Sequence, residues 1–367
     1  MAEINVSEVK GEVNYEEAMK EFGIEDISSY LKKLDKLPLI YRRRVVFAHR
    51  GFQQIFNAIK NKKRFAVLTG FNPSGPPHLG NLLFLKQALF FQSCGAEVFI
   101  PISNDETYVF RKSESLEKAT KNAYEHVLPD IIALGFKKSK THIFISTKDP
   151  RIYELAVKLS AKTTFSTIKA IFGFNNETNP GAIFYSMIQS AHILLPQLED
   201  FGGPKPTVVP IGIDQDPYMR LSRDLAEKIG MLKPSSTYHK FLPGLQGGKM
   251  SGSKPETCIF LTDKPEEARK KIMRAFSGGA ATLEEHRKQG GNPDIDVACI
   301  DVACQYLFSL FEESDRKIKE IFAGYRSGSL HSGDVKSYLA KTVEKFLKDH
   351  QKKREKAKKR IASFMLK

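Results

Sequence analysis

The sequence lacks long apolar runs and has few cysteines. No run reaches the ~18–20 apolar residues of a membrane-spanning helix, and the first residues, MAEINVSEVKGEVNYEE, are too acidic and polar for a secretory signal. The four cysteines are Cys94, Cys258, Cys299 and Cys304; they form no CxxC pair and no disulfide-scaffold spacing. We therefore expect free thiols, no protein-held metal and a cytoplasmic protein without membrane contact.

Tryptophan is absent, and acidic residues are outnumbered by basic ones. With no Trp and 26 Phe, the core has to be filled mainly by phenylalanine and aliphatic side chains. Hydrophobic residues make up 41% and charged residues 27% of the 367 residues, which excludes a disordered or fibrous chain. The formal net charge of +15 attracts polyanions, nucleic acid being the usual one. A basic surface kept for solubility explains the charge equally well.

From residue 64 onward, short apolar runs alternate with helical stretches. The runs that read as buried strands are 64–69, 97–103, 141–146, 207–212 and 257–262. Helical spacing lies between them at 78–93, 114–134, 150–171, 183–199 and 215–229. Such alternation predicts an α/β fold with a Rossmann-like parallel sheet.

The two ends of the chain show no such alternation. Residues 1–62 are polar with scattered apolar positions, which predicts an N-terminal helical extension. Residues 264–275, 295–325 and 333–366 carry helical spacing without a strand signal, which predicts a C-terminal all-α domain. We therefore divide the chain into 1–62, 63–263 with an insertion at about 105–205, and 264–367.

The first predicted strand runs through the loop FNPSGPPHLGN (71–81) into a helix. Gly70, Gly75 and Gly80 permit close backbone approach by a ligand. The start of a helix after the first strand of a parallel sheet is a ready anion site, and His78 stands there with a side chain that can donate to phosphate oxygens. Taken alone, HLGN is a weak match, and a helix-start histidine without a ligand explains it better.

Two further segments have the composition of a nucleotide site. KMSGS (249–253) is a cationic loop rich in glycine and serine that can close on a polyphosphate. The alternative is an exposed, flexible turn. At the end of the run 207–212, Gly212 would let a ribose approach while Asp214 accepts from its hydroxyls. The alternative for Asp214 is a helix N-cap.

In this order HLGN, IDQDPYMRLSRD (213–224) and KMSGS resemble the motifs of class I aminoacyl-tRNA synthetases. More narrowly, the chain resembles the archaeal and eukaryotic tryptophanyl-tRNA synthetases over roughly residues 12–365. The additional stretches that carry this likeness are RRRVVFAHR (42–50), AIFGFNN (170–176), LPGLQGG (242–248) and AFSGG with EEHRKQGGNPDIDV (275–297).

The resemblance implies ATP-dependent activation of L-tryptophan and its transfer to tRNA(Trp), with Mg²⁺ arriving on ATP. It implies a homodimer formed through the insertion, an anticodon-binding C-terminal domain and no editing site. A tyrosyl-tRNA synthetase, which shares fold and motifs, is the first alternative. A tRNA-binding paralogue without catalysis and a small nucleotidyltransferase are the others.

The resemblance also assigns site residues. The catalytic residues would be His78, Asn81, Lys249, Ser251 and Ser253. ATP would be bound by Thr69, Gly70, Pro73, Ser74, Gly80, Gly212, Asp214, Lys249, Met250 and Ser251. The amino acid would be held by Glu106, Gln189 and Gln215, with Ser103 and His192 as candidates for the indole N–H.

The chain departs from the family pattern at four positions. Asn81 replaces the closing histidine of the first motif, as it does in bacterial tryptophan enzymes. Gly252 replaces a lysine of the second motif, so Lys249, with Lys254 as a further candidate, has to carry more of the phosphate charge. Leu68 and Pro101 stand where eukaryotic enzymes bind the indole N–H with tyrosine and glutamine. These two positions leave indole recognition unassigned.

Overall fold

The computed structural model describes residues 3–4, 9–10, 13–247, 250, 252, 254–277 and 301–366. Its strands are β1 (Glu3–Ile4), β2 (Val9–Lys10), β3 (Glu25–Asp26), β4 (Val46–Arg50), β5 (Ala66–Leu68), β6 (Glu97–Ile102), β7 (Thr141–Ile145), β8 (Thr207–Gly212) and β9 (Ser235–His239). Strands β1 and β2 form a two-stranded sheet, and the other seven form one sheet in the order β3-β4-β9-β8-β5-β6-β7.

The sheet is doubly wound around β5. The strands from β9 to β7 pair in parallel, whereas β4 pairs antiparallel with β9 and β3 with β4. The chain moves outward from β5 to β6 and β7 and then returns to the other side of β5 for β8 and β9. The strand order therefore reverses between β5 and β8, and ligands of such sheets bind at the carboxyl ends of the strands at this point.

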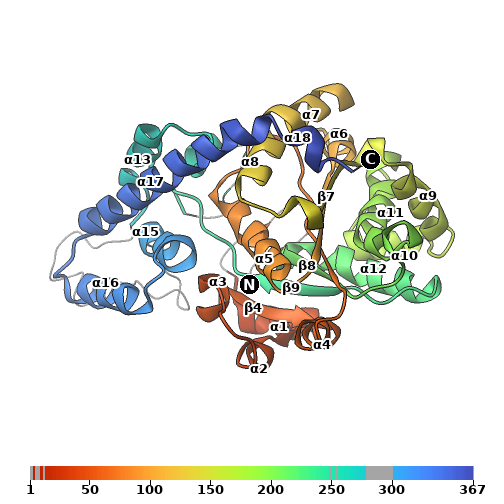
Figure 1. The fold of residues 1–367 in the computed structure, drawn as a ribbon, viewed down its shortest axis with the longest axis horizontal. Coiled ribbons are helices and arrows are strands. Elements are labelled where there is room, and N and C mark those ends of the chain that lie inside the picture. Colours follow the sequence, from red (N-terminus) through yellow and green to blue (C-terminus); the bar gives the residue numbers. More distant parts are fainter. Residues whose placement is uncertain are drawn as a thin grey trace.

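Successive residues of each strand point to opposite faces of the sheet. Val67 packs into one hydrophobic cluster, and Ala66 and Leu68 pack into another. The first cluster is covered by α5 (Leu82–Ser93), α8 (Leu128–Ala133), α13 (Pro265–Met273) and α17 (Ser332–Lys358). The second is covered by α9 (Pro150–Ser160), α10 (Phe165–Phe172), α11 (Pro180–Leu194) and α12 (Asp216–Lys228), which lie together in green at the right of Figure 1.

The remaining helices lie at the periphery of these two layers. They are α1 (Tyr15–Phe22), α2 (Ser28–Leu31), α3 (Leu39–Arg42), α4 (Gln53–Lys60), α6 (Asn104–Val109), α7 (Leu116–Asn122), α15 (Val302–Tyr306), α16 (Asp315–Ser327) and α18 (Ile361–Phe364). In Figure 1, α1 to α4 lie below the sheet and the long helix α17 crosses above it. No helix in the described part of the chain is long and apolar enough to cross a membrane.

Helix α17 joins the C-terminal helices to the sheet through one buried carboxylate. Asp130 of α8 is fully buried and accepts from His350 Nε2 at 2.8 Å. Arg354 Nε lies 3.0 Å from the same carboxylate, and its Nη2 donates to the Glu125 carbonyl at 2.8 Å. The C-terminal helices therefore share a core with the sheet instead of standing apart from it.

The predicted α/β fold with a mostly parallel sheet and a helical C-terminal part is confirmed. The prediction of a strand at 257–262 is wrong. A 3-10 turn, Pro255–Thr257, overlaps the start of this segment, and its pairing is limited to a single bridge between Phe260 and His78. The N-terminal segment contains the expected helices, but it also supplies β3 and β4 to the sheet, which the helical interpretation missed.

Candidate active site

The HLGN motif forms a short helical turn, Leu79–Asn81, directly before α5. The Asn81 side chain closes this turn, because its Oδ1 accepts from the His78 backbone N–H at 2.8 Å. In return the Asn81 backbone N–H donates to the His78 carbonyl at 2.9 Å. The Asn81 Nδ2 has no hydrogen-bond partner among the described residues, so it can donate to a ligand.

The His78 ring lies where the HLGN and KMSGS motifs meet. A Cβ placed on Gly80 would come 3.0 Å from His78 Cε1 and 3.2 Å from Met250 Sδ, so only glycine lets these groups approach. On the other side, a Cβ on Gly252 would lie 3.8 Å from His78 Cδ2. Met250 and Gly252 belong to KMSGS, so this loop packs around the ring although it is distant in sequence.

Burial shapes the chemistry of His78. It lowers the pKa of the imidazole to about 4, so the ring is neutral at pH 7. The Nδ1 atom is buried without a hydrogen-bond partner among the described residues. Asn72 Nδ2, in the loop between β5 and His78, is in the same state. Buried polar atoms without partners are rare, and here they suit a polar ligand.

The segment after KMSGS is hydrogen-bonded to the HLGN motif and to the residue before it. The Leu79 N–H donates to the Ile259 carbonyl at 3.0 Å, and the Leu261 N–H donates to the Pro77 carbonyl at 2.8 Å. The apolar run 257–262 therefore pairs with the loop in front of α5 and not with a strand. Lys249, Ser251 and Ser253, which the sequence predicts to hold phosphate, lie outside the described residues.

Gly212 and Asp214 stand at the carboxyl end of β8. A Cβ on Gly212 would lie 2.6 Å from Asp214 Oδ1 and 2.8 Å from Phe241 Cε1, so a side chain does not fit there. Asp214 lies inside the turn Ile213–Gln215, while the N-cap of α12 is Gln215. The N-cap alternative for Asp214 is therefore wrong.

Tyr15 is a residue near this motif that sequence reasoning missed. Its hydroxyl accepts from the Phe241 backbone N–H at 2.9 Å, which ties α1 to the segment that covers Gly212. Burial, with a smaller contribution from nearby Asp214, raises the pKa of Tyr15 well above its usual value. No sequence motif marks this contact, because it joins residues more than two hundred positions apart.

Two of the residues predicted to hold the amino acid share a network with a candidate for the indole. The Tyr185 hydroxyl lies 3.2 Å from Glu106 Oε2 and 2.9 Å from Gln189 Oε1. Gln189 Oε1 lies 3.4 Å from His192 Nδ1. The network continues through Ser146 to Asp105, and neither of these two residues nor Tyr185 was predicted. Their signal in the sequence is adjacency: Asp105 precedes Glu106, and Tyr185 lies one turn before Gln189.

The other predicted ligand residues are distributed around the network. Gln215 donates to Asp214 Oδ2 at 3.2 Å and so lies with the predicted ribose residues. The Thr69 N–H donates to the Phe99 carbonyl at 3.0 Å, and a Cβ on Gly70 would meet Pro101 Cγ at 3.6 Å. Buried Ser103, at the start of α6, accepts from Thr107 through its carbonyl. In the same loop region Pro73 is buried and Ser74 is exposed.

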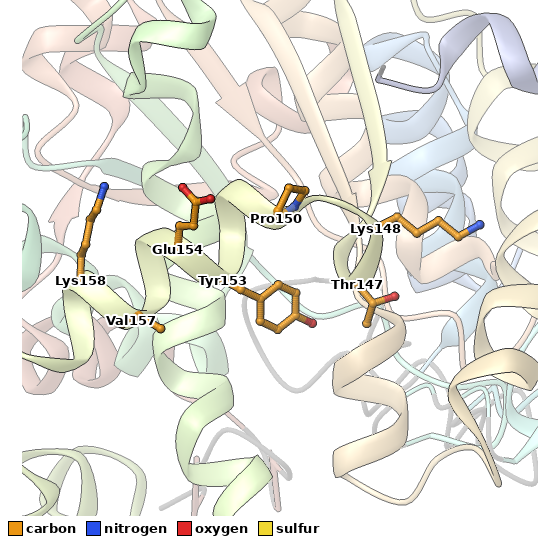
Figure 2. A pocket seen from close by; sticks show the side chains of 7 residues that line it. All are labelled: Thr147, Lys148, Pro150, Tyr153, Glu154, Val157 and Lys158. Carbon is orange, nitrogen blue, oxygen red and sulfur yellow. The ribbon is translucent and has the colours of Figure 1, made fainter.

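An open pocket of about 690 Å³ lies outside α9, beside the network (Figure 2). Tyr153 lines it, and the Tyr153 hydroxyl donates to Asp105 Oδ2 at 2.9 Å. Exposed Val157 is another lining residue. A second pocket of about 250 Å³, between α10 and α11, includes Phe165, which is also exposed. Both pockets lie on the predicted insertion, and neither is lined by a residue of HLGN or KMSGS.

Comparison with known proteins agrees with this geometry. The model of the family described as tRNA synthetases class I (W and Y) matches residues 60–348. The tryptophan–tRNA ligase of Methanocaldococcus jannaschii is 41% identical over 363 residues, which cover 98% of this chain and 96% of that protein. The tryptophan–tRNA ligase of Thermococcus sibiricus is 40% identical over 372 residues, covering 99% and 94%.

Solved structures give the same result. The crystal structure of tryptophanyl-tRNA synthetase from Aeropyrum pernix matches with a TM-score of 0.89 and 36% identity, covering 96% of each chain. The tryptophan-bound enzyme of Encephalitozoon cuniculi matches with a TM-score of 0.83 and 28% identity, covering 96% of this chain and 99% of that one. The tyrosyl alternative is not favoured. This chain belongs to the tryptophanyl-tRNA synthetases, the tryptophan–tRNA ligases of class I.

Proposed function

We propose that this chain activates L-tryptophan with ATP and transfers it to tRNA(Trp). The proposal rests on one observation: Met250 and Gly252 of KMSGS lie against the His78 ring of HLGN. A neutral, buried donor between two glycine-containing loops suits the phosphate chain of ATP.

In the first step the tryptophan carboxylate attacks the α-phosphate of ATP in line, giving tryptophanyl-adenylate and pyrophosphate. The step needs no covalent enzyme nucleophile, because positioning and charge stabilisation suffice for phosphoryl chemistry. His78 and Asn81 donate to the α-phosphate oxygens as negative charge develops. Lys249, Ser251 and Ser253 hold the departing pyrophosphate, and Mg²⁺ enters as part of the Mg–ATP substrate.

The nucleoside and the amino acid lie on either side of this phosphate. The loop 69–74 and Gly80 leave room for the nucleotide, while Gly212 and Asp214 hold the ribose. Glu106, Gln189 and Gln215 hold the amino acid, and the adenylate then passes its acyl group to the 3′ end of tRNA. Ser103 remains a candidate for the indole. His192 has both ring nitrogens engaged by Ser146 and Gln189, which speaks against a direct contact.

We further propose a cytoplasmic homodimer. The pockets on α9 to α11, with exposed Val157 and Phe165, support a second copy as the partner of the insertion. Residues 264–367 are proposed to bind the anticodon. Sedimentation would test the dimer, and mutation of Val157→Glu is expected to yield monomers; a monomeric wild-type protein would contradict this assembly.

The decisive experiment is pyrophosphate–ATP exchange with each of the twenty amino acids. We expect exchange with tryptophan. If a hydrogen bond recognises the indole N–H, kcat/KM for tryptophan should exceed that for tyrosine by at least ~10⁴-fold. If shape alone discriminates, this ratio should be roughly 10–200-fold. A benzothiophene analogue, which lacks the N–H, separates these two accounts. Stronger exchange with tyrosine than with tryptophan would contradict the substrate assignment, and no exchange at all would favour a tRNA-binding paralogue.

A further inference from the structure

Four side chains form a continuous hydrogen-bonded chain between two neighbouring carboxylates of α6. From Asp105, the chain runs to Ser146 Oγ at 2.5 Å and on to His192 Nε2 at 2.9 Å. His192 Nδ1 faces the Gln189 amide at 3.4 Å, and this same amide end lies 2.9 Å from the Tyr185 hydroxyl. Tyr185 completes the chain at Glu106, 3.2 Å away.

The carboxylates at the two ends of this chain fix which group donates in each of its hydrogen bonds. Ionised carboxylates only accept, so Ser146 donates to Asp105 and Tyr185 donates to Glu106. Ser146 then accepts from His192 Nε2, and Tyr185 accepts from Gln189. With both ends accepting, one group in the middle has to donate in both directions. Because the single hydroxyl proton of Tyr185 goes to Glu106, this group has to be the NH₂ group of Gln189, which has two protons.

The surroundings of His192 agree with this assignment, because an NH₂ group that faces Nδ1 needs an unprotonated Nδ1. The ring is fully buried, and this burial lowers its pKa to about 4, although Asp105 and Asp149 oppose the shift. Among the described residues, its nitrogens face Ser146 and Gln189, which are both uncharged. A neutral His192 with its proton on Nε2 offers a lone pair on Nδ1, and that lone pair needs a donor.

The Gln189 amide is therefore oriented with its nitrogen toward His192 and Tyr185. The two ends of an amide have nearly the same shape, so their assignment follows from the hydrogen bonds around them. In this orientation the carbonyl oxygen of Gln189 points away from both partners. The amide end opposite His192 has no hydrogen bond within the described part of the chain, and Gln189 is partly exposed.

We propose that His192 is a positioning residue, which holds the carbonyl oxygen of Gln189 toward the α-ammonium group of the amino-acid substrate. The inference rests on the proposed function, which places the amino acid at Gln189 and Glu106. An ammonium group only donates, so it requires acceptors. With the amide held this way, Gln189 adds a carbonyl oxygen beside the Glu106 carboxylate. The reverse orientation presents an NH₂ group that repels the ammonium.

Two isosteric substitutions test this role. The side-chain oxygen of asparagine falls near the position of Nδ1, so His192→Asn keeps an acceptor for Gln189. The side chain of glutamine reaches the position of Nε2, so His192→Gln keeps the Ser146 contact and loses the acceptor. We expect His192→Gln to raise the KM for tryptophan about tenfold in pyrophosphate exchange, the effect of one lost hydrogen bond to a charged group. We expect His192→Asn to stay within about threefold, and the KM for ATP to change in neither variant.

Two further variants control for packing and folding. Ser190→Ala removes a buried hydroxyl on the same helix that bonds the Ser186 carbonyl outside the network, so its KM for tryptophan should match the wild type. Ser146→Ala leaves the ring in place and removes the partner of Nε2, so it should raise the same KM about threefold. This variant decides the question if His192→Gln does not fold.

The possible outcomes are distinct. Equal increases in KM for His192→Gln and His192→Asn would overturn the proposal, since packing alone would explain them. A loss with tryptophan that disappears with the benzothiophene analogue would also overturn it, because His192 would then contact the indole N–H. If the wild type activates tyrosine instead, the proposed substrate fails, but the same comparison with tyrosine still tests His192, since every amino acid carries the α-ammonium.

Discussion

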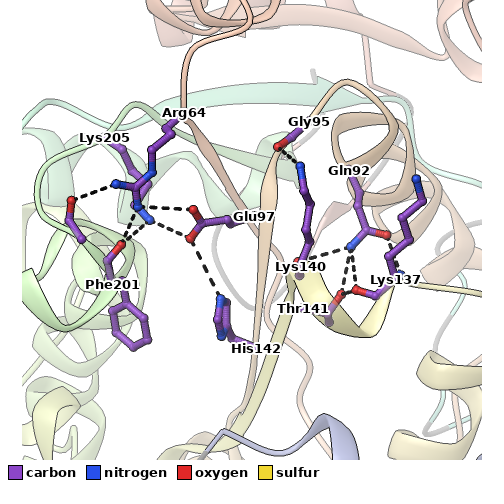
Figure 3. A network of polar contacts seen from close by, with 11 residues as sticks. Arg64, Gln92, Gly95, Glu97, Lys137, Lys140, Thr141, His142, Phe201 and Lys205 are labelled. Carbon is purple, nitrogen blue, oxygen red and sulfur yellow. Dashed lines mark hydrogen bonds and ion pairs between the residues drawn. The ribbon is translucent and has the colours of Figure 1, made fainter.

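Polar side chains at the amino ends of the parallel strands pair with one another, whereas some polar atoms at the carboxyl ends have no such partner. At the amino ends, Glu97 accepts from Lys205 Nζ at 2.7 Å and from Arg64 Nη2 at 3.4 Å, and His142 Nε2 lies 4.0 Å from the oxygen that binds Lys205 (Figure 3). Nearby, the Gln92 amide donates to Thr141 Oγ1 at 2.9 Å and accepts from the Lys137 N–H at 2.8 Å. The polar side chains at the amino ends therefore have protein partners for their hydrogen bonds.

At the carboxyl ends, by contrast, the structure leaves polar atoms without protein partners. Within the described residues, His78 Nδ1 and Asn72 Nδ2 are buried and unpaired. An unsatisfied buried polar atom destabilises the fold by about 1–3 kcal/mol. The carboxyl ends therefore keep, beside satisfied networks such as that of Asp105 and Ser146, groups that a ligand can satisfy.

The largest expected effect lies at the amino ends. Replacement Glu97→Gln removes the charge that compensates Lys205, whose pKa burial already lowers. Breaking such a buried pair costs about 3–5 kcal/mol, which urea denaturation would measure. The KM for tryptophan and kcat should be unchanged. Glu117→Gln, at an exposed glutamate of α7, is the matched control and should change stability by less than about 0.5 kcal/mol. A drop in kcat for Glu97→Gln with normal stability would contradict the division between the two ends.

At the carboxyl ends we expect the reverse result for His78→Ala. The variant loses a donor to charge that develops in the transition state, so adenylate formation should slow roughly 10²–10³-fold. Its stability should fall less than that of Glu97→Gln, because Nδ1 forms no hydrogen bond within the described residues and only the packing of the ring is lost. Single-turnover exchange and urea denaturation would measure both quantities. His126→Ala, at a half-exposed histidine, serves as the control. A wild-type rate for His78→Ala would remove the residue from the site.

A third test uses His239, a buried histidine at the carboxyl end of β9. Gln87 Nε2 donates to its Nδ1 at 3.1 Å, and Gln87 Oε1 is occupied by Thr237 at 2.8 Å, so the ring has to stay neutral. Burial lowers the pKa of His239 to about 4. The unfolded chain thus binds a proton below about pH 6.5 that the folded protein binds only near pH 4.

The stabilising contribution of His239 is therefore complete above pH 6.5 and is lost as the pH falls toward 4. We expect this site to contribute about 2–3 kcal/mol to the loss. Urea denaturation at pH 7 and pH 4.5 would measure it, and His239→Asn, which keeps an acceptor for Gln87, should flatten the decline. An equally steep decline in the variant would mean that other groups dominate acid unfolding.

The same contrast explains what the sequence could predict. The strands at 64–69, 97–103, 141–146 and 207–212 carry the apolar pattern of a buried strand, and all four are present. Strand β9, SSTYH, is fully buried but polar. Its hydroxyls are satisfied by distant partners, such as Gln54 for Ser235 and Gln87 for Thr237, which no local pattern reveals. The run 257–262 is apolar because it packs under the HLGN motif, so apolarity alone misidentified it as a strand.

The candidate site was predictable where a motif carries the chemistry and not where the fold assembles it. Gly80 and Gly212 could be recognised, since the spacing of glycines marks close approaches. Tyr15 and Ser146 could not, because each acts through a partner on another element, whereas Tyr185 is marked only by its place one turn before Gln189. The roles of Lys249, Ser251 and Ser253 stay predictions.

Paired and unpaired charged side chains also lie close together on helix α17, where we expect the smallest effect of a mutation. The sequence shows one basic run, Lys352, Lys353, Arg354, Lys356, Lys358, Lys359 and Arg360. The structure divides it: Arg354 is buried against Asp130 and Lys358 pairs with Glu355 at 2.7 Å. Lys352 and Lys356 are exposed and form no ion pair within the described residues. Lys352 and Lys356 are four residues apart and share one helix face, so we expect this basic face to meet the tRNA phosphates.

Reversing both charges, Lys352→Glu with Lys356→Glu, should weaken tRNA binding modestly and flatten its dependence on salt. Each lost phosphate contact lowers the slope of log K against log salt by about 0.7–0.9, so we expect a change of about 1.5 from filter binding at several salt concentrations. Adenylate formation should not change, since neither residue approaches the phosphate motifs. Lys32→Glu with Lys33→Glu makes the same change in net charge near α2 and should leave the slope nearly intact. Equal slopes for the two double variants would make the basic face of α17 a solvated surface, and the link between unpaired groups and ligands would then hold only for the carboxyl ends of the sheet.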